Sequence, residues 1–99
     1  MDSFGSQIKK LREQQQLPLR TVAAYLDIDQ ASLSKIEHGR RKASREQVIQ
    51  LAKYFNTNEN QLLVTWLSDK LAHEIQDEDL AIQALKAAEK KVDYFKKKK

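Results

Sequence analysis

The sequence contains only two glycines and one proline in 99 residues, and no useful stretch alternates apolar and polar residues as a strand would. Its apolar residues instead recur at intervals of three and four, as in Phe4, Ile8 and Leu11. That spacing gathers side chains on one side of an α-helix. The sequence therefore predicts an all-α fold.

Six helices are expected, each opening at a residue that suits a helix start. These residues are Ser3 or Asp2, Pro18, Asp29, Ser44, Asn58 and Asp77. The first three helices are expected to end near Gln16, Leu26 and His38, and Gly39 supplies a left-handed stop. The residues of the first four helices that form an apolar face or point inward are Phe4, Ile8, Leu11, Val22, Ala23, Leu26, Leu33, Ile36, Val48, Leu51, Ala52 and Phe55. The apolar residues of the fifth helix are Leu62, Leu63, Trp66, Leu67, Leu71 and Ile75.

The second and third expected helices are short, and only three residues, 27–29, join them. Helices joined so tightly cross steeply, which leaves the later one protruding. A protruding helix of about nine residues fits the major groove of B-DNA. Leu33 and Ile36 would face inward, while Gln30 and Lys35 would face outward, where Gln can pair with adenine and Lys can donate to guanine. The expected partner is double-stranded DNA.

Basic residues cluster beside this helix. Residues 1–58 hold ten Lys or Arg and six Asp or Glu, for a net charge of +4, whereas residues 59–99 hold eight of each. Within residues 35–45 there are five basic residues and one acid, Glu37. A basic cluster next to an ordered motif is typical of phosphate binding.

The segment LPLRTVAAYLDIDQASLSKIEHGRRKAS resembles the Cro/Xre helix-turn-helix family, which includes the lambda and 434 phage repressors. The resemblance covers about residues 4–64. It rests on Leu17, Val22, Ala23, Leu26, Ile28, Leu33, Ile36, Glu37, Gly39, Leu51, Ala52 and Phe55. It implies a five-helix repressor-like domain, here followed by an added C-terminal helix, and a role in regulating transcription.

The resemblance also implies roles for individual residues. The expected base contacts come from Gln30, Ala31, Ser32 and Lys35. The expected phosphate contacts come from Arg20, Thr21, Ser34, His38, Arg40, Arg41 and Lys42. Arg12 and Glu37 match a structural ion pair between the first and third helices. Gln16 and Asp27 stand where the family often has glycine, and Leu19 cannot make the phosphate contact usual at its position.

We expect a DNA-binding domain over residues 1–66 and a helical extension over residues 67–99 that ends in a disordered lysine tail, Lys96–Lys99. The extension carries surplus apolar residues, which predicts a homodimer. The expected interface residues are Trp66, Leu67, Leu71, Ile75, Leu80 and Leu85. The charge is split, since residues 59–79 carry −5 and residues 80–99 carry +5.

Other classes of protein lack support in the sequence. There is no cysteine, the two histidines lie on different expected helices, and no nucleophile–base pair appears, so we expect no enzyme activity, no metal and no cofactor. No apolar run could span a membrane and no signal peptide is visible, so a cytoplasmic location is expected.

Two functions remain open. The first is a regulator, more a repressor or autoregulator than an activator, that binds a palindromic operator as a dimer; its size resembles that of restriction–modification controller proteins. The alternative is an antitoxin-type protein whose extension binds a partner protein while the helix-turn-helix controls its own gene.

Overall fold

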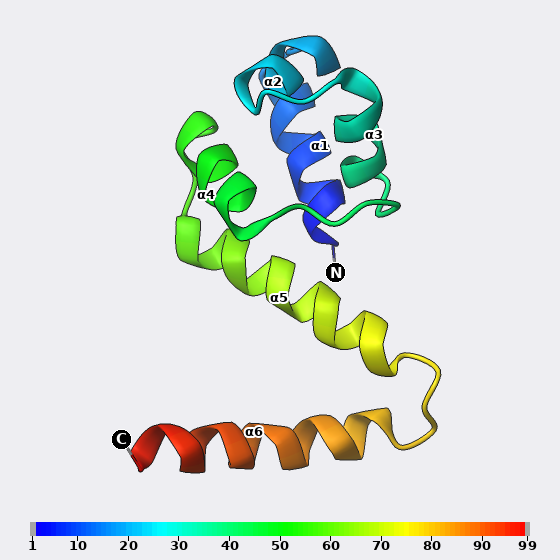
Figure 1. The fold of residues 1–99 in the computed structure, drawn as a ribbon, viewed down its shortest axis with the longest axis vertical. Helices are drawn as coiled ribbons and strands as arrows, with labels where there is room; N and C mark the ends of the chain where they lie inside the picture. The colour runs from blue at the N-terminus through cyan, green and yellow to red at the C-terminus, as the bar shows by residue number, and fades with distance from the viewer. Residues whose placement is uncertain (1, 99) are drawn as a thin grey trace.

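The computed structural model describes residues 2–98, which form six α-helices and no strand (Figure 1). Their bounds are α1 Phe4–Gln14, α2 Leu19–Tyr25, α3 Gln30–Glu37, α4 Arg45–Tyr54, α5 Glu59–Ile75 and α6 Ala81–Lys97. The expected all-α class is confirmed. Among the described residues, no helix has the length and apolar character needed to cross a membrane.

Helices α1 to α5 enclose one hydrophobic core. Close packing joins α4 to α5, α2 to α3, and α1 to both α3 and α5. Ile8, Leu33 and Leu51 are fully buried at its centre. All the residues expected to point inward belong to this core, except that Leu11 is partly buried and packs against it. The sixth helix lies outside the core, and none of its residues is buried.

The first four helices end in the same way, with a left-handed residue followed by a sharp change of direction. After α1, Gln16 N–H donates to Glu13 O and Leu17 N–H donates to Arg12 O. The equivalent bonds follow α2, α3 and α4. The left-handed residues are Gln16 (φ 55°), Asp27 (φ 57°), Gly39 (φ 75°) and Asn56 (φ 53°). Gln16 and Asp27 therefore carry a conformational cost of about 1 kcal/mol that glycine would avoid.

Four of the expected helix caps are present. Side-chain oxygens of Ser3, Asp29, Ser44 and Asn58 accept backbone N–H groups of α1, α3, α4 and α5. The expected cap at Asp77 is wrong, because α6 begins only after Leu80. Glu78 N–H donates to Ile75 O and Ala81 N–H donates to Glu78 O, so Asp77 lies in a turn that precedes the helix.

Trp66 belongs to the core, whereas the sequence analysis placed it in a dimer interface. Its side chain is only 7% exposed, and its indole Nε1 donates to Ala43 O over 2.9 Å. Three residues further along α5, Asp69 Oδ2 accepts the N–H of Phe4 over 2.8 Å. The packed domain thus extends at least to Asp69, because this carboxylate satisfies a donor at the start of α1.

The expected disordered tail also differs from the structure. Lys96 and Lys97 form the last turn of α6, where positive charge interacts favourably with the helix dipole, and Lys97 pairs with Asp93 at 3.1 Å. Lys99 lies outside the described residues.

An ion pair fixes α3 against α1. Arg12 Nε lies 2.8 Å from Glu37 Oε2, and Arg12 Nη2 lies 3.1 Å from Glu37 Oε1. The third guanidinium nitrogen, Nη1, donates to Leu17 O over 2.9 Å. The Glu37 side chain is 1% exposed and that of Arg12 is 11% exposed. Hydrogen bonding to Glu37 raises the pKa of Arg12 above its usual value.

Gly5 lets the backbones of α1 and α3 approach closely. A Cβ at this position would overlap the carbonyl oxygen of Ile36 and lie 2.5 Å from that of Glu37. Both obstacles are backbone atoms, so a small shift of a side chain cannot relieve them. The start of α1 therefore requires glycine for a steric reason.

We predict that Glu37→Ala lowers the free energy of unfolding by about 3 kcal/mol, because the Arg12 charge would be left partly buried without its partner. Urea denaturation measures the change. Asp2→Ala, which breaks the exposed pair with Lys10, is the control and should leave the midpoint unchanged. An unchanged midpoint in Glu37→Ala would contradict the structural role of the pair.

We also predict that Gly5→Ala destabilises the domain by roughly 1–3 kcal/mol, because the added methyl group must push α1 away from α3. Thermal denaturation followed by circular dichroism measures this. Gln14→Ala adds no bulk at an exposed position of the same helix and should stay within about 0.5 kcal/mol of the parent. Equal stability of the two variants would mean that the helices are less tightly packed.

Candidate nucleic-acid interface

Helix α3 has one buried side and one open side. Leu33, Ile36 and Glu37 are buried, whereas Gln30, Ala31 and Lys35 are exposed. Ser32 is partly buried at the edge of the open side. All four residues expected to contact bases thus come from one helix, and three of them are fully open to a ligand. The open side is short and polar, as a helix in the major groove requires.

Asp29 holds the N-terminus of α3. Its Oδ1 accepts the N–H of Ser32 over 2.7 Å. Hydrogen bonds from the backbone and side chain of Ser32 lower the pKa of Asp29, with smaller contributions from the charges of Arg41 and Lys35. Asp29 is therefore a structural acid placed among the groups expected to face DNA.

Arg41 links the loop after α3 to the open side of that helix. Its Nη1 donates to Ser32 Oγ over 2.9 Å. The sequence assigned Arg41 to phosphate and Ser32 to bases, but the structure brings these two side chains together. The pair forms one polar unit beside Gln30 and Lys35.

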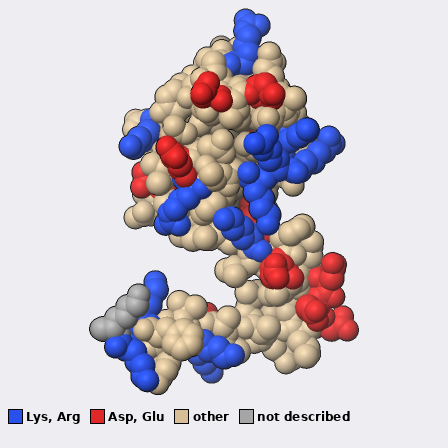
Figure 2. All heavy atoms as spheres, viewed as in Figure 1, with Lys and Arg blue, Asp and Glu red and all other residues tan. Residues whose placement is uncertain are grey.

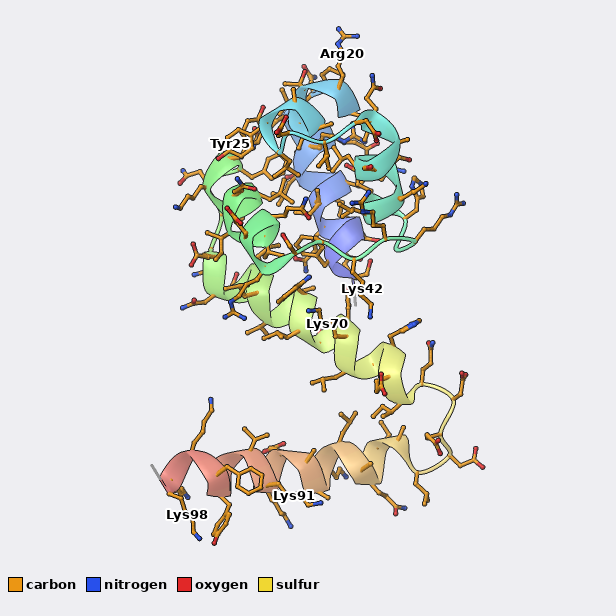
Figure 3. All side chains as sticks on the ribbon, in the orientation of Figure 1. Arg20, Tyr25, Lys42, Lys70, Lys91 and Lys98 are labelled. Carbon is orange, nitrogen blue, oxygen red and sulfur yellow. The ribbon has the colours of Figure 1, made fainter. Side chains whose placement is uncertain are left out.

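The remaining residues expected to contact phosphate lie around α3. Arg40 and Lys42 are exposed in the loop that follows it, and Arg20 and Thr21 are exposed in the first turn of α2. In Figure 3, Arg20 and Lys42 lie beyond opposite ends of α3. Figure 2 shows Lys and Arg gathered on the right-hand side of the domain, over α3 and its loop. This arrangement places positive charge near both ends of the exposed helix.

His38 and Ser34 complete the expected set. His38 follows the last residue of α3, and its Nδ1 lies 2.8 Å from Ser34 O. Because a carbonyl can only accept, Nδ1 carries the proton of this bond. Ser34 itself is partly buried, and its carbonyl also accepts the N–H of His38. The bond fixes the imidazole ring at the edge of the basic loop.

Sequence reasoning did not single out Lys70. Its Nζ lies 3.5 Å from the centre of the Trp66 ring, and it lies close to Lys42 in Figure 3. A pocket of about 480 Å³ lies at this point, lined by residues 40–43, by the start of α1 and by the part of α5 that carries Lys70. The only available signal was an isolated lysine within the acidic stretch 59–79, which does not reveal that Lys70 lines a pocket shared with the basic loop.

Comparison with known proteins agrees with this geometry. A family model described as helix-turn-helix matches residues 8–62, which is more than half of the chain. The chain is also 42% identical, over 41 residues, to the HTH-type transcriptional repressor RghR of Bacillus subtilis (strain 168). That match covers 41% of this chain and only 30% of the relative's length. No solved structure matches significantly.

The matched region begins within α1 and includes the whole of α2, α3 and α4. It thus contains the protruding helix and the basic loop, and it stops before the exposed end of α5 and before α6. On this match, the chain belongs to the helix-turn-helix family of DNA-binding proteins.

Proposed function

We propose that this protein is a sequence-specific regulator of transcription that binds a palindromic operator as a homodimer. One observation carries the proposal. The open, polar side of α3 is bordered by basic residues of the α3–α4 loop and of α2, and α3 itself is fixed to the domain by the Arg12–Glu37 pair. Similarity to a repressor favours repression over activation of transcription.

In this proposal α3 lies in the major groove and reads base edges. Gln30 and Lys35 are the principal readers, because an amide can bind adenine by two hydrogen bonds and an ammonium group can donate to guanine. Ala31 and Ser32 are small, so they let the helix approach the bases. Arg41, held at Ser32, lies near enough to the same surface to contribute at its edge.

The phosphate contacts would position α3 in the groove. Arg40, Arg41 and Lys42 bind one strand after α3, while Arg20 and Thr21 bind from the start of α2. Ser34 and His38 contribute at the end of α3. Leu19 has no polar side-chain atom that could bind phosphate, and it packs, partly buried, against the core.

A dimer is proposed because eight residues of helix read too few bases for high specificity. Two recognition helices related by a two-fold axis, about 34 Å apart, would read successive major grooves. Apolar residues left exposed or half-buried on α5, on α6 and in the turn between them supply the surface for such pairing, with Leu67, Leu71, Ile75, Leu80 and Leu85 as the proposed interface.

A second function has one observation in its favour. Helix α6 is amphipathic, yet none of its residues is buried within the chain. An antitoxin-type protein would use such a helix to bind and neutralise another protein. In that case α6 should be cut rapidly by protease in the isolated protein, whereas a helix buried in a homodimer should be protected.

Selection of bound sites from random DNA tests the proposal. The selected sites should be palindromic, and Gln30→Ala and Lys35→Ala should each lose about 1–3 kcal/mol of binding free energy on the best site and relax its sequence preference. Lys53→Ala, at an exposed position of α4, is the control and should bind like the parent. Failure to enrich any sequence would overturn the proposed function.

We predict a different effect for the basic loop. Arg40→Ala and Lys42→Ala should weaken binding to selected and random DNA equally, and each should lower the slope of log K against log salt by about one. Fluorescence anisotropy at several salt concentrations measures both quantities. A loss confined to the selected site would instead assign these residues to bases.

A further inference from the structure

Helix α5 is apolar on two opposite sides. Its core side carries Leu62, Leu63 and Trp66, which are buried. The opposite side carries four apolar residues at intervals of three and four, which are Val64, Leu67, Leu71 and Ile75. Val64 is 65% exposed, Leu67 41% and Leu71 58%. We call these four residues the α5 stripe; a helix with two apolar sides is typically covered on both.

Helix α6 carries a matching surface. Ala81, Leu85, Ala88, Val92 and Phe95 follow one another at intervals of four, three, four and three, which is the spacing of a helix-pairing seam. We call these five residues the α6 seam. Val92 is 51% exposed and Phe95 is 62% exposed. Most of the stability of a helix in a protein comes from packing its amphipathic face against another surface, so α6 is expected to have a covering surface.

The chain's own α6 does not cover the α5 stripe. Figure 1 shows α6 diverging from α5 after the connecting turn, and Figure 2 shows open space between α6 and the body of the domain. Most of each apolar surface is therefore exposed in a single chain, and of the nine residues only Ile75, Ala81 and Leu85, near the connecting turn, are half-buried. Since one chain carries both, a second copy can satisfy both at once.

Charge favours pairing α5 with α6 rather than α6 with α6. Residues 59–79 hold six acids and one lysine, whereas residues 80–98 hold six lysines and two acids. Figure 2 shows acids gathered at the end of α5 and over the turn that follows it, where three of the six lie, and lysines gathered on α6. Two α6 helices side by side would bring like charges together, whereas α6 on α5 brings opposite charges together.

We propose that two copies exchange their C-terminal helices, so that the α6 seam of each copy docks on the α5 stripe of the other. Each copy donates one helix and receives one, which closes the assembly as a two-fold dimer. The inference deepens the proposed function, because it names the surface that would hold two recognition helices at a fixed separation.

The chain has no cysteine, so single-cysteine variants report contacts directly. Tagged full-length Leu71→Cys is mixed with untagged full-length Ala88→Cys, the mixture is unfolded and refolded together, and it is then oxidised. Disulfides between tagged and untagged chains should form about tenfold more than with Lys90→Cys, which lies on the opposite side of α6, because a disulfide requires close Cα atoms. The pair Leu67→Cys and Val92→Cys tests the same contact one turn further along each helix.

Three results would overturn the exchange. Ala88→Cys alone could cross-link mainly to itself, which would mean α6–α6 pairing. A chain carrying both cysteines could form mainly an internal disulfide, which would mean that α6 folds back on its own α5. Sedimentation of the unmodified chain could show only monomer at micromolar concentration, which would favour another protein as the occupant.

Failure here is distinguishable from failure of the proposed function. A palindromic selected site together with α6–α6 cross-links would leave the regulator proposal standing and remove only the exchange. Cross-links between α5 and α6 without any enriched DNA sequence would do the reverse.

Discussion

The Arg12–Glu37 ion pair is the contact on which the presentation of α3 depends. It joins the first helix of the domain to the last residue of α3, and its third nitrogen also binds Leu17 O in the turn before α2. One guanidinium therefore restrains three segments at once. Because Glu37 is buried, each oxygen of its carboxylate needs a partner, which permits few other arrangements of α3.

The turns between helices impose a second restraint. After each of the first four helices, a left-handed residue and the residue that follows it donate backbone hydrogen bonds to carbonyl oxygens of the helix. This ending makes the chain change direction within two or three residues, so α2 and α3 cross rather than align. Only Gly39 adopts this conformation without cost; Gln16 and Asp27 are held in it by the packing on both sides.

The domain and its extension are stabilised differently. The domain buries its apolar residues internally, and Trp66 and Asp69 tie the first half of α5 to it. Beyond Asp69 the chain leaves most of its apolar side chains exposed, and this is the surface that the proposed assembly would cover. In the proposed function, DNA binding and assembly belong to separate parts of one chain that share a single continuous helix.

Much of the site could be predicted from the sequence because it follows local rules. The cap at Asp29, the stop at Gly39 and the inward pair Leu33 and Ile36 fix the limits and the open side of α3. The basic loop was visible as a local charge excess. The family resemblance implied one contact between distant residues, the Arg12–Glu37 pair, but local rules could not predict others, and the link from Arg41 to Ser32 has no signal in spacing or composition.

The sequence by itself determined the order of the helices, most of their limits, and the buried and open sides of α3, since these depend on periodicity and capping within a few residues. Tertiary structure alone decided that Trp66 is core, that Gly5 must admit the backbone of α3, and that Asp69 completes the domain. It also decided that α6 stands uncovered within one chain. These features depend on which surfaces meet in space, and an apolar stripe has the same spacing whether its own chain or another copy covers it.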